Sequence, residues 1–173
     1  MLFRSILTTA EKKGILKPNH KSLAAEQMMQ LNKIGAILGN MKSVHAMTDV
    51  TGFGLLGHLT EMSEGSGVSG KVFLNKVPLI TSDLNFYINQ KCIPGGTTRN
   101  WESYGNKIGF DNHINVDYAK AILSDPQTSG GLLIAVDANE ADIVKSLLLE
   151  NGLYAEPIGQ IIKQESILIS ICD

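Results

Sequence analysis

Apolar residues recur with a helical period near the start of this chain. Between residues 18 and 39 they return every three or four positions, as they do on one face of an amphipathic helix. This face consists of Leu23, Ala24, Met28, Leu31, Ile34 and Leu38. Pro18-Asn19 is typical of a helix entry and Gly39-Asn40 of a helix end. The pattern predicts one helix over this segment.

A strand, a turn and a second helix are predicted next. Val44 to Met47 is a short apolar run suited to a strand, and residues 48–52 form a polar turn. Helical spacing then returns through Phe53, Leu55, Leu56, Leu59 and Met62. The order strand, turn, helix places the polar residues of the turn just before a helix N-terminus.

The alternation of elements continues to the end of the chain. Strands are predicted at 68–77, 132–136, 158–162 and 167–171, and helices at 79–90, 115–124 and 137–152. Residues 92–112 are rich in Gly, Asn and Thr and are predicted to be a long connection, which inside a compact domain is usually functional or mobile. The succession predicts an α/β or α+β domain with a mixed sheet covered by helices.

Composition excludes several partners. The 173 residues, 43% of them hydrophobic, are enough for one domain with a core. The net charge of -2, with both signs interspersed, argues against binding to nucleic acid or an anionic membrane. Apolar runs such as Leu132 to Val136 are far shorter than the roughly 20 residues that cross a bilayer. The N-terminus has no apolar signal core, so we expect a cytoplasmic protein.

The two cysteines, Cys92 and Cys172, lie far apart, and neither has a Cys or His at metal-ligand spacing. This predicts neither a zinc site nor a disulfide framework. Both are interpreted as small buried apolar residues or unreactive surface thiols.

Asp49 is the first candidate for chemistry because it precedes a helix whose free N–H groups attract anions. Mg²⁺ typically binds one or two carboxylates together with phosphate oxygens, so one aspartate is a reasonable contribution to such a site. The spacing is also typical of a helix cap formed by Thr48, Asp49 or Thr51. Local pattern leaves both interpretations open.

The glycines at 52, 54 and 57 match neither a P-loop nor the dinucleotide fingerprint. Glycine in a helix costs about 1 kcal/mol relative to alanine, so these three indicate close approach of another backbone. His58 has no partner visible in the sequence and is interpreted as structural. We find no complete catalytic constellation in the chain.

Two further segments carry polar groups. In the first, Gly95, Gly96, Arg99 and Asn100 combine a flexible backbone with side chains that contact either phosphate or a neighbouring loop. In the second, residues 125–131, hydroxyls and glycines precede a strand, where they either shape a site edge or make a turn.

Three stretches together resemble the C-terminal domain of selenophosphate synthetases (selenide, water dikinases), within the aminoimidazole ribonucleotide synthetase-like superfamily. They are MTDVTGFGLLGHL at 47–59, CIPGGTTRN at 92–100 and SDPQTSGGLL at 124–133. The resemblance implies a reaction of ATP, selenide and water that gives selenophosphate, AMP and phosphate and requires Mg²⁺. It implies that Asp49 is the metal-binding aspartate of this domain. We take Thr48, Asp49, Gly95, Gly96, Arg99 and Asn100 as the candidate residues facing ATP.

The family's N-terminal domain carries a glycine-rich nucleotide loop, a Cys or selenocysteine followed by Lys, and further metal-binding aspartates, and this chain shows none of these. We therefore expect residues 1–12 to be a truncated linker or extension and 13–173 to be the C-terminal domain. Alone the chain is expected to be inactive. Its expected partners are the N-terminal ATP-binding domain, selenide and, in the intact enzyme, a second copy. Alternatives are a non-catalytic binding or assembly module, or another phosphotransferase of the superfamily.

Overall fold

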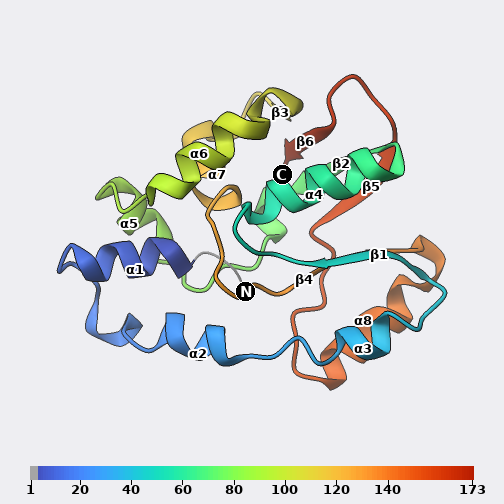
Figure 1. Ribbon diagram of the computed structural model, residues 1–173, viewed down its shortest axis with the longest axis horizontal. Helices are drawn as coiled ribbons and strands as arrows, with labels where there is room; N and C mark the ends of the chain where they lie inside the picture. Colours follow the sequence, from blue (N-terminus) through green and yellow to red (C-terminus); the bar gives the residue numbers. More distant parts are fainter. Residues whose placement is uncertain (1–3) are drawn as a thin grey trace.

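The computed structural model describes residues 4–173 (Figure 1). Its helices are α1 (Arg4–Lys12), α2 (Leu23–Met29), α3 (Gly35–Leu38), α4 (Gly54–Ser66), α5 (Leu84–Asn89), α6 (Gly95–Tyr104), α7 (Val116–Leu123) and α8 (Ala141–Glu150). Its strands are β1 (Val44–Asp49), β2 (Val68–Phe73), β3 (Ile108–Phe110), β4 (Leu132–Val136), β5 (Gly159–Lys163) and β6 (Ile169–Cys172). The predicted α/β or α+β class is confirmed.

The strands form two sheets. One is mixed, in the order β3-β6-β2-β5, with β6 parallel to both β2 and β3 and with β5 antiparallel to β2. Helix α4 packs on this sheet and also contacts α6 and α7. The second sheet is the antiparallel pair β1-β4, in which Asp49 stands opposite Leu132. The mixed, helix-covered sheet was predicted, and its separation from β1-β4 was not.

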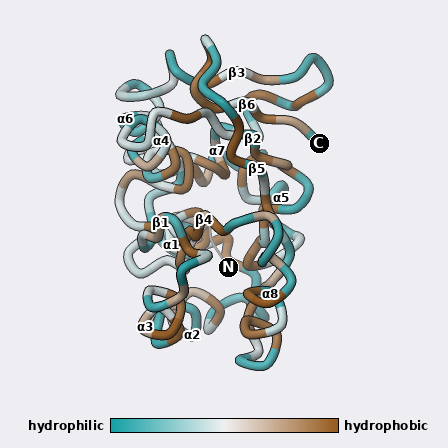
Figure 2. The backbone as a smooth tube through the Cα atoms, turned by 90° about the vertical axis from the view of Figure 1, so that its right-hand side faces the viewer, coloured by the Kyte–Doolittle hydropathy of each residue, from teal (hydrophilic) through white to brown (hydrophobic). Residues whose placement is uncertain are grey.

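Apolar side chains gather in two clusters. The larger one lies between the four-stranded sheet and its helices, and it includes Leu55, Leu56 and Ile171. The smaller one joins α3, α8 and the β1-β4 pair through Ile34, Leu38 and Val144. Figure 2 shows hydrophobic segments around β2 and β6 and, toward the other end of the molecule, around α3 and α8. Each sheet therefore has its own buried layer.

The single helix predicted for residues 18–39 is wrong. A 3₁₀ turn (Pro18–His20), α2 and α3 occupy this segment, and the chain is extended at Gln30, with φ -72° and ψ 120°. Met29 and Leu31 are 71% and 72% exposed. The apolar spacing was misleading because Leu31 is exposed between α2 and α3, whereas Ile34 and Leu38 are buried in the smaller cluster.

The prediction of a long connection at 92–112 is also wrong, because this segment contains α6 and β3. Thr97, Asn100 and Tyr104 are buried on one side of α6 at helical spacing. Two of the three are polar, so the apolar pattern did not reveal this face. The helix predicted at 79–90 is shorter than expected and is confined to α5.

The described part of the expected linker is helix α1. Its Ile6, Leu7 and Ala10 are at most 1% exposed and belong to the larger cluster. Burial of this kind is typical of a helix inside a domain. Residues 4–12 thus pack with the domain that was expected to begin at 13, and residues 1–3 lie outside the described residues.

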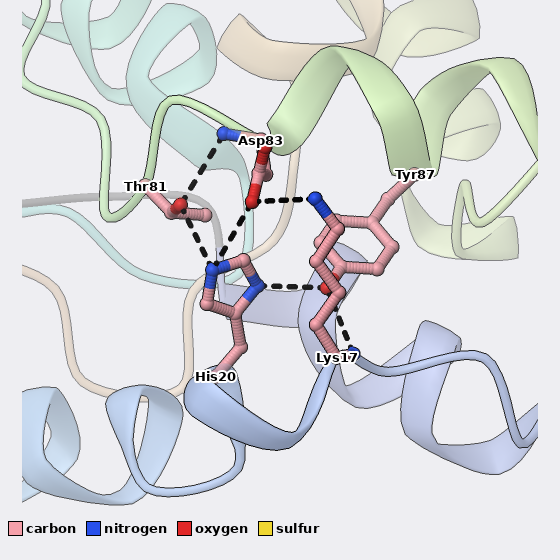
Figure 3. A network of polar contacts seen from close by, with 5 residues as sticks. All are labelled: Lys17, His20, Thr81, Asp83 and Tyr87. Atoms are coloured by element: carbon pink, nitrogen blue, oxygen red, sulfur yellow. Dashed lines mark hydrogen bonds and ion pairs between the residues drawn. The ribbon is translucent and has the colours of Figure 1, made fainter.

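A polar network ties the segment after α1 to α5 (Figure 3). Buried Tyr87 accepts the Lys17 N–H at 3.1 Å and lies 2.7 Å from His20 Nδ1. His20 Nε2 faces Asp83 at 3.4 Å, and Lys17 Nζ lies 2.8 Å from the same carboxylate. The hydrogen bond from Lys17 and its charge hold the pKa of Asp83 below its usual value. The network gives His20 a structural partner on each ring nitrogen.

Candidate functional site

Asp49 is the last residue of β1, and its side chain is exposed. Its carboxylate makes no hydrogen bond or ion pair with any residue that the structure describes. Helix α4 begins at Gly54 with Phe53 as its N-cap, and no side chain caps it. The structure therefore contradicts the alternative in which Thr48, Asp49 or Thr51 caps this helix with its side chain. The carboxylate is free to meet a ligand from outside the chain.

The backbone directly after Asp49 lies against residues 124–131. The Val50 N–H donates to Gly131 O at 2.9 Å, and the Gln127 N–H donates to Thr51 O at 2.9 Å. A Cβ on Gly130 would lie 2.0 Å from Val50 O, so only glycine permits this approach. Residues 125–131 thus support the turn at 50–53.

Helix α6 supports the same turn from another side. Asn100 Nδ2 donates to Gly52 O at 2.8 Å and to Ser124 O at 3.0 Å. The Tyr104 hydroxyl donates to Phe53 O at 2.8 Å. The three stretches singled out in the sequence therefore meet around residues 50–53, and the Asn100 amide N–H groups are engaged by protein backbone.

The other candidate residues are spread around this turn. Thr48 is half-buried and lines a shallow pocket of about 190 Å³ together with His58 and Glu61. Gly95 and Arg99 are exposed in the first turns of α6, where the Arg99 guanidinium folds back over Gly95. Gly96 packs on Pro126. Of these residues, Thr48 donates its hydroxyl to Asp49 O at 3.3 Å, and Asn100 contacts the turn.

His58 has a partner that the sequence did not reveal. Its Nε2 accepts the Thr51 N–H at 3.0 Å, and its Nδ1 lies 3.4 Å from Glu61 Oε2. The structural interpretation of His58 thus fits its contacts. Sequence reasoning also missed Tyr104 and Gln127. The only signal for Tyr104 was its position four residues after Asn100, which puts both on one helix face.

Burial raises the pKa of Tyr104 to about 12. Because the ordinary tyrosine pKa is about 10, the unfolded chain loses this proton first as pH rises. The stability that Tyr104 contributes is therefore fully present below pH 10 and is lost between pH 10 and about 12.

We expect the free energy of unfolding to fall more steeply in the wild type than in Tyr104→Phe over this pH range. Urea unfolding at half-unit steps from pH 9 to 11.5 measures the difference, and comparing the two proteins cancels the lysine titration that they share. Parallel curves would contradict the assigned role of the Tyr104 hydroxyl.

The described residues contain no group of three or more His, Cys, Asp or Glu side chains placed to hold a metal ion. Asp49 fits the role of a single oxygen ligand, since it is exposed and unpaired, but Mg²⁺ requires more oxygen ligands than this one carboxylate provides. Cys92 is fully buried, and burial raises the pKa of its thiol, which disfavours the nucleophilic thiolate. None of the described helices is long and apolar enough to cross a membrane.

Sequence comparisons extend these observations. Residues 1–170 match the family described as AIR synthase related protein, C-terminal domain. The chain is 51% identical to the selenide, water dikinase of Pasteurella multocida over 160 residues, which are 92% of this chain and 44% of that protein. It is 49% identical to the selenide, water dikinase of Aeromonas hydrophila, over 90% of this chain and 44% of that protein. It is 47% identical to the selenide, water dikinase of Yersinia pestis, over 93% of this chain and 45% of that protein. The chain thus spans less than half the length of these relatives.

Proposed function

Since the chain belongs to the family of AIR synthase related proteins, as a C-terminal domain, we propose that it serves an ATP-dependent selenophosphate synthetase. The proposed reaction converts ATP, selenide and water to selenophosphate, AMP and phosphate. Its main support is the exposed, unpaired Asp49 carboxylate, braced by three stretches that are far apart in the sequence. Relatives that are about half identical are selenide, water dikinases.

In this proposal Asp49 supplies one carboxylate to a Mg²⁺ site that is completed by an N-terminal ATP-binding domain. The bound ion would neutralise phosphate charge, which is how metal ions assist phosphoryl transfer. The residues of this chain hold that carboxylate in place: Asn100 and residues 125–131 fix the turn, and Thr48 precedes the ligand in β1. Arg99 and the Gly95-Gly96 backbone, at the exposed start of α6, are proposed to contact phosphate. A cytoplasmic location and a homodimer of the intact enzyme belong to the same proposal.

One carboxylate cannot hold a polyphosphate through the cleavage of two anhydride bonds, because such a reaction needs several metal and donor contacts in a site that controls water. We therefore expect this chain alone to form no AMP from ATP and selenide. Adding the separately produced N-terminal portion of the Pasteurella multocida relative should restore Mg²⁺-dependent AMP and selenophosphate formation, which ³¹P NMR detects. Robust AMP formation by this chain alone would refute the proposal. The proposal would also be refuted if the two parts bind each other and their mixture forms no AMP.

A second candidate is a non-catalytic binding or assembly module. The observation that favours it is a group of apolar side chains that remain exposed on and beside α2 and α3: Met28, Met29, Leu31 and Ile37. Surfaces of this kind mark interaction sites. The mixing experiment separates the two functions, since a module of this type would bind the added portion without generating AMP.

A further inference from the structure

We propose that His58 is a positioning residue for the Asp49 carboxylate and acts through the backbone of Thr51. This inference rests on the proposed role of Asp49 as a metal ligand. It concerns a side chain that would touch neither metal nor ATP, because its Nε2 is already engaged by the protein. Its importance for turnover would lie in the direction in which Asp49 points.

The contacts show which nitrogen of the His58 ring accepts a hydrogen bond. A backbone N–H can only donate, so Nε2, 3.0 Å from the Thr51 nitrogen, must present its lone pair. The ring proton therefore lies on Nδ1, which faces Glu61 Oε2 at 3.4 Å. The Phe53 ring meets the imidazole edge-on, with centroids 6.0 Å apart, and the His58 side chain is 11% exposed. Glu61 and Phe53 thus hold the ring in one orientation, with Nε2 facing Thr51.

The backbone transmits this contact to Asp49. Since the Asp49 side chain has no partner among the described residues, the backbone on either side of it sets its direction. On one side β1 pairs with β4, and on the other Val50 is buried and its N–H is held by Gly131 O. The Thr51 N–H is the next backbone N–H along the chain, two residues after Asp49, and it donates to His58 Nε2.

His58 differs from the other side chains that brace residues 50–53. Asn100 and Tyr104 donate to the carbonyl oxygens of Gly52 and Phe53, which lie farther from Asp49. Within the described structure, His58 is the bracing side chain that accepts a hydrogen bond. Without it, the part-buried Thr51 N–H would lose this acceptor, and the peptide between Val50 and Thr51 would be held less firmly.

The first part of the test uses ¹⁵N NMR on this chain. The His58 ring should show the neutral Nδ1–H tautomer. In His58→Phe, which keeps the ring shape but has no acceptor, the Thr51 amide should exchange with water about 10-fold faster, as loss of one hydrogen bond implies. His58→Gln should restore protection, because its Oε1 extends about as far as Nε2, whereas the shorter His58→Asn should not. Unchanged Thr51 protection in His58→Phe and His58→Asn would overturn the inference.

The second part uses the assembly with the added N-terminal portion. The Mg²⁺ concentration for half-maximal AMP formation should rise about 10-fold in His58→Phe, again the effect of one hydrogen bond. The KM for ATP at saturating Mg²⁺ should stay unchanged, and His58→Gln should recover most of the loss. A purely structural role would instead lower the thermal midpoint without this selective change. His45→Phe is the matched control, because His45 is a histidine of β1 with a side chain 63% exposed.

The two proposals fail in different ways. If Asp49→Asn alters the Mg²⁺ dependence and His58→Phe does not, the positioning role of His58 is wrong and the proposed function stands. If Asp49→Asn leaves the Mg²⁺ dependence unchanged, the metal-ligand role of Asp49 is wrong and the positioning role is lost with it.

Discussion

Asp49→Asn should reduce Mg²⁺-dependent AMP formation by the assembled enzyme at least about 100-fold, because a neutral amide would replace the carboxylate that we propose as a ligand of the metal. The fold should be unaffected, since the Asp49 side chain is exposed and has no partner among the described residues. Initial rates over a range of Mg²⁺ concentrations measure the first effect, and thermal unfolding followed by circular dichroism measures the second.

Asp111→Asn provides the matched control for this experiment. Asp111 is also exposed and directly follows a strand, β3, but it lies outside the convergence of the three stretches. Its replacement should leave the rate unchanged. A rate within about threefold of wild type for Asp49→Asn, a difference below 1 kcal/mol in barrier height, would show that Asp49 is not a ligand.

Gly54→Ala should lower the free energy of unfolding by about 2 to 5 kcal/mol, which combines the cost of a left-handed backbone with that of a forced contact. Gly54 has φ +70° at the first position of α4. A Cβ there would lie 2.8 Å from the carbonyl carbon of Ser124 and 3.0 Å from Leu123 O. Because both neighbours are backbone atoms, the end of α7 would have to move. Urea unfolding measures the loss.

Gly67 separates these two costs. It ends α4 with φ +62°, and a Cβ added to it would meet nothing within 4 Å. Gly67→Ala should therefore show only the conformational cost, about 1 kcal/mol. Equal losses in the two variants would mean that close packing on residues 123–125 contributes nothing.

The sequence predicted those parts of the fold whose signal is local. The strand, turn and helix between Val44 and Met62 are present as β1 and α4, because their apolar periods reflect real burial. The close backbone approach inferred from the glycines is confirmed at Gly54, and Gly57 packs tightly against Phe53 and Tyr104. The strands near the C-terminus are present as β5 and β6.

What depends on contacts between distant segments was not predictable. Asn100 looked like a group that contacts either phosphate or a loop, and its bonds to Gly52 and Ser124 arise only when α6 packs beside α4 and α7. Helix α6 itself was missed because Thr97 and Asn100 on its buried face are polar. Conversely, Met28 and Leu31 were expected on a helical core face, and they are exposed.

The division of the apolar side chains into two clusters bears on how heat would affect the proposed cation site. Within β1, Met47 packs with the smaller cluster, whereas Val50, just past Asp49, belongs to the larger one. Asp49 thus sits at the joint between two units, of which the smaller has far fewer buried side chains to resist local opening. Warming that loosens only the α3-α8 unit would shift the carboxylate while the larger unit stays folded, so cation affinity would decline at temperatures below global melting.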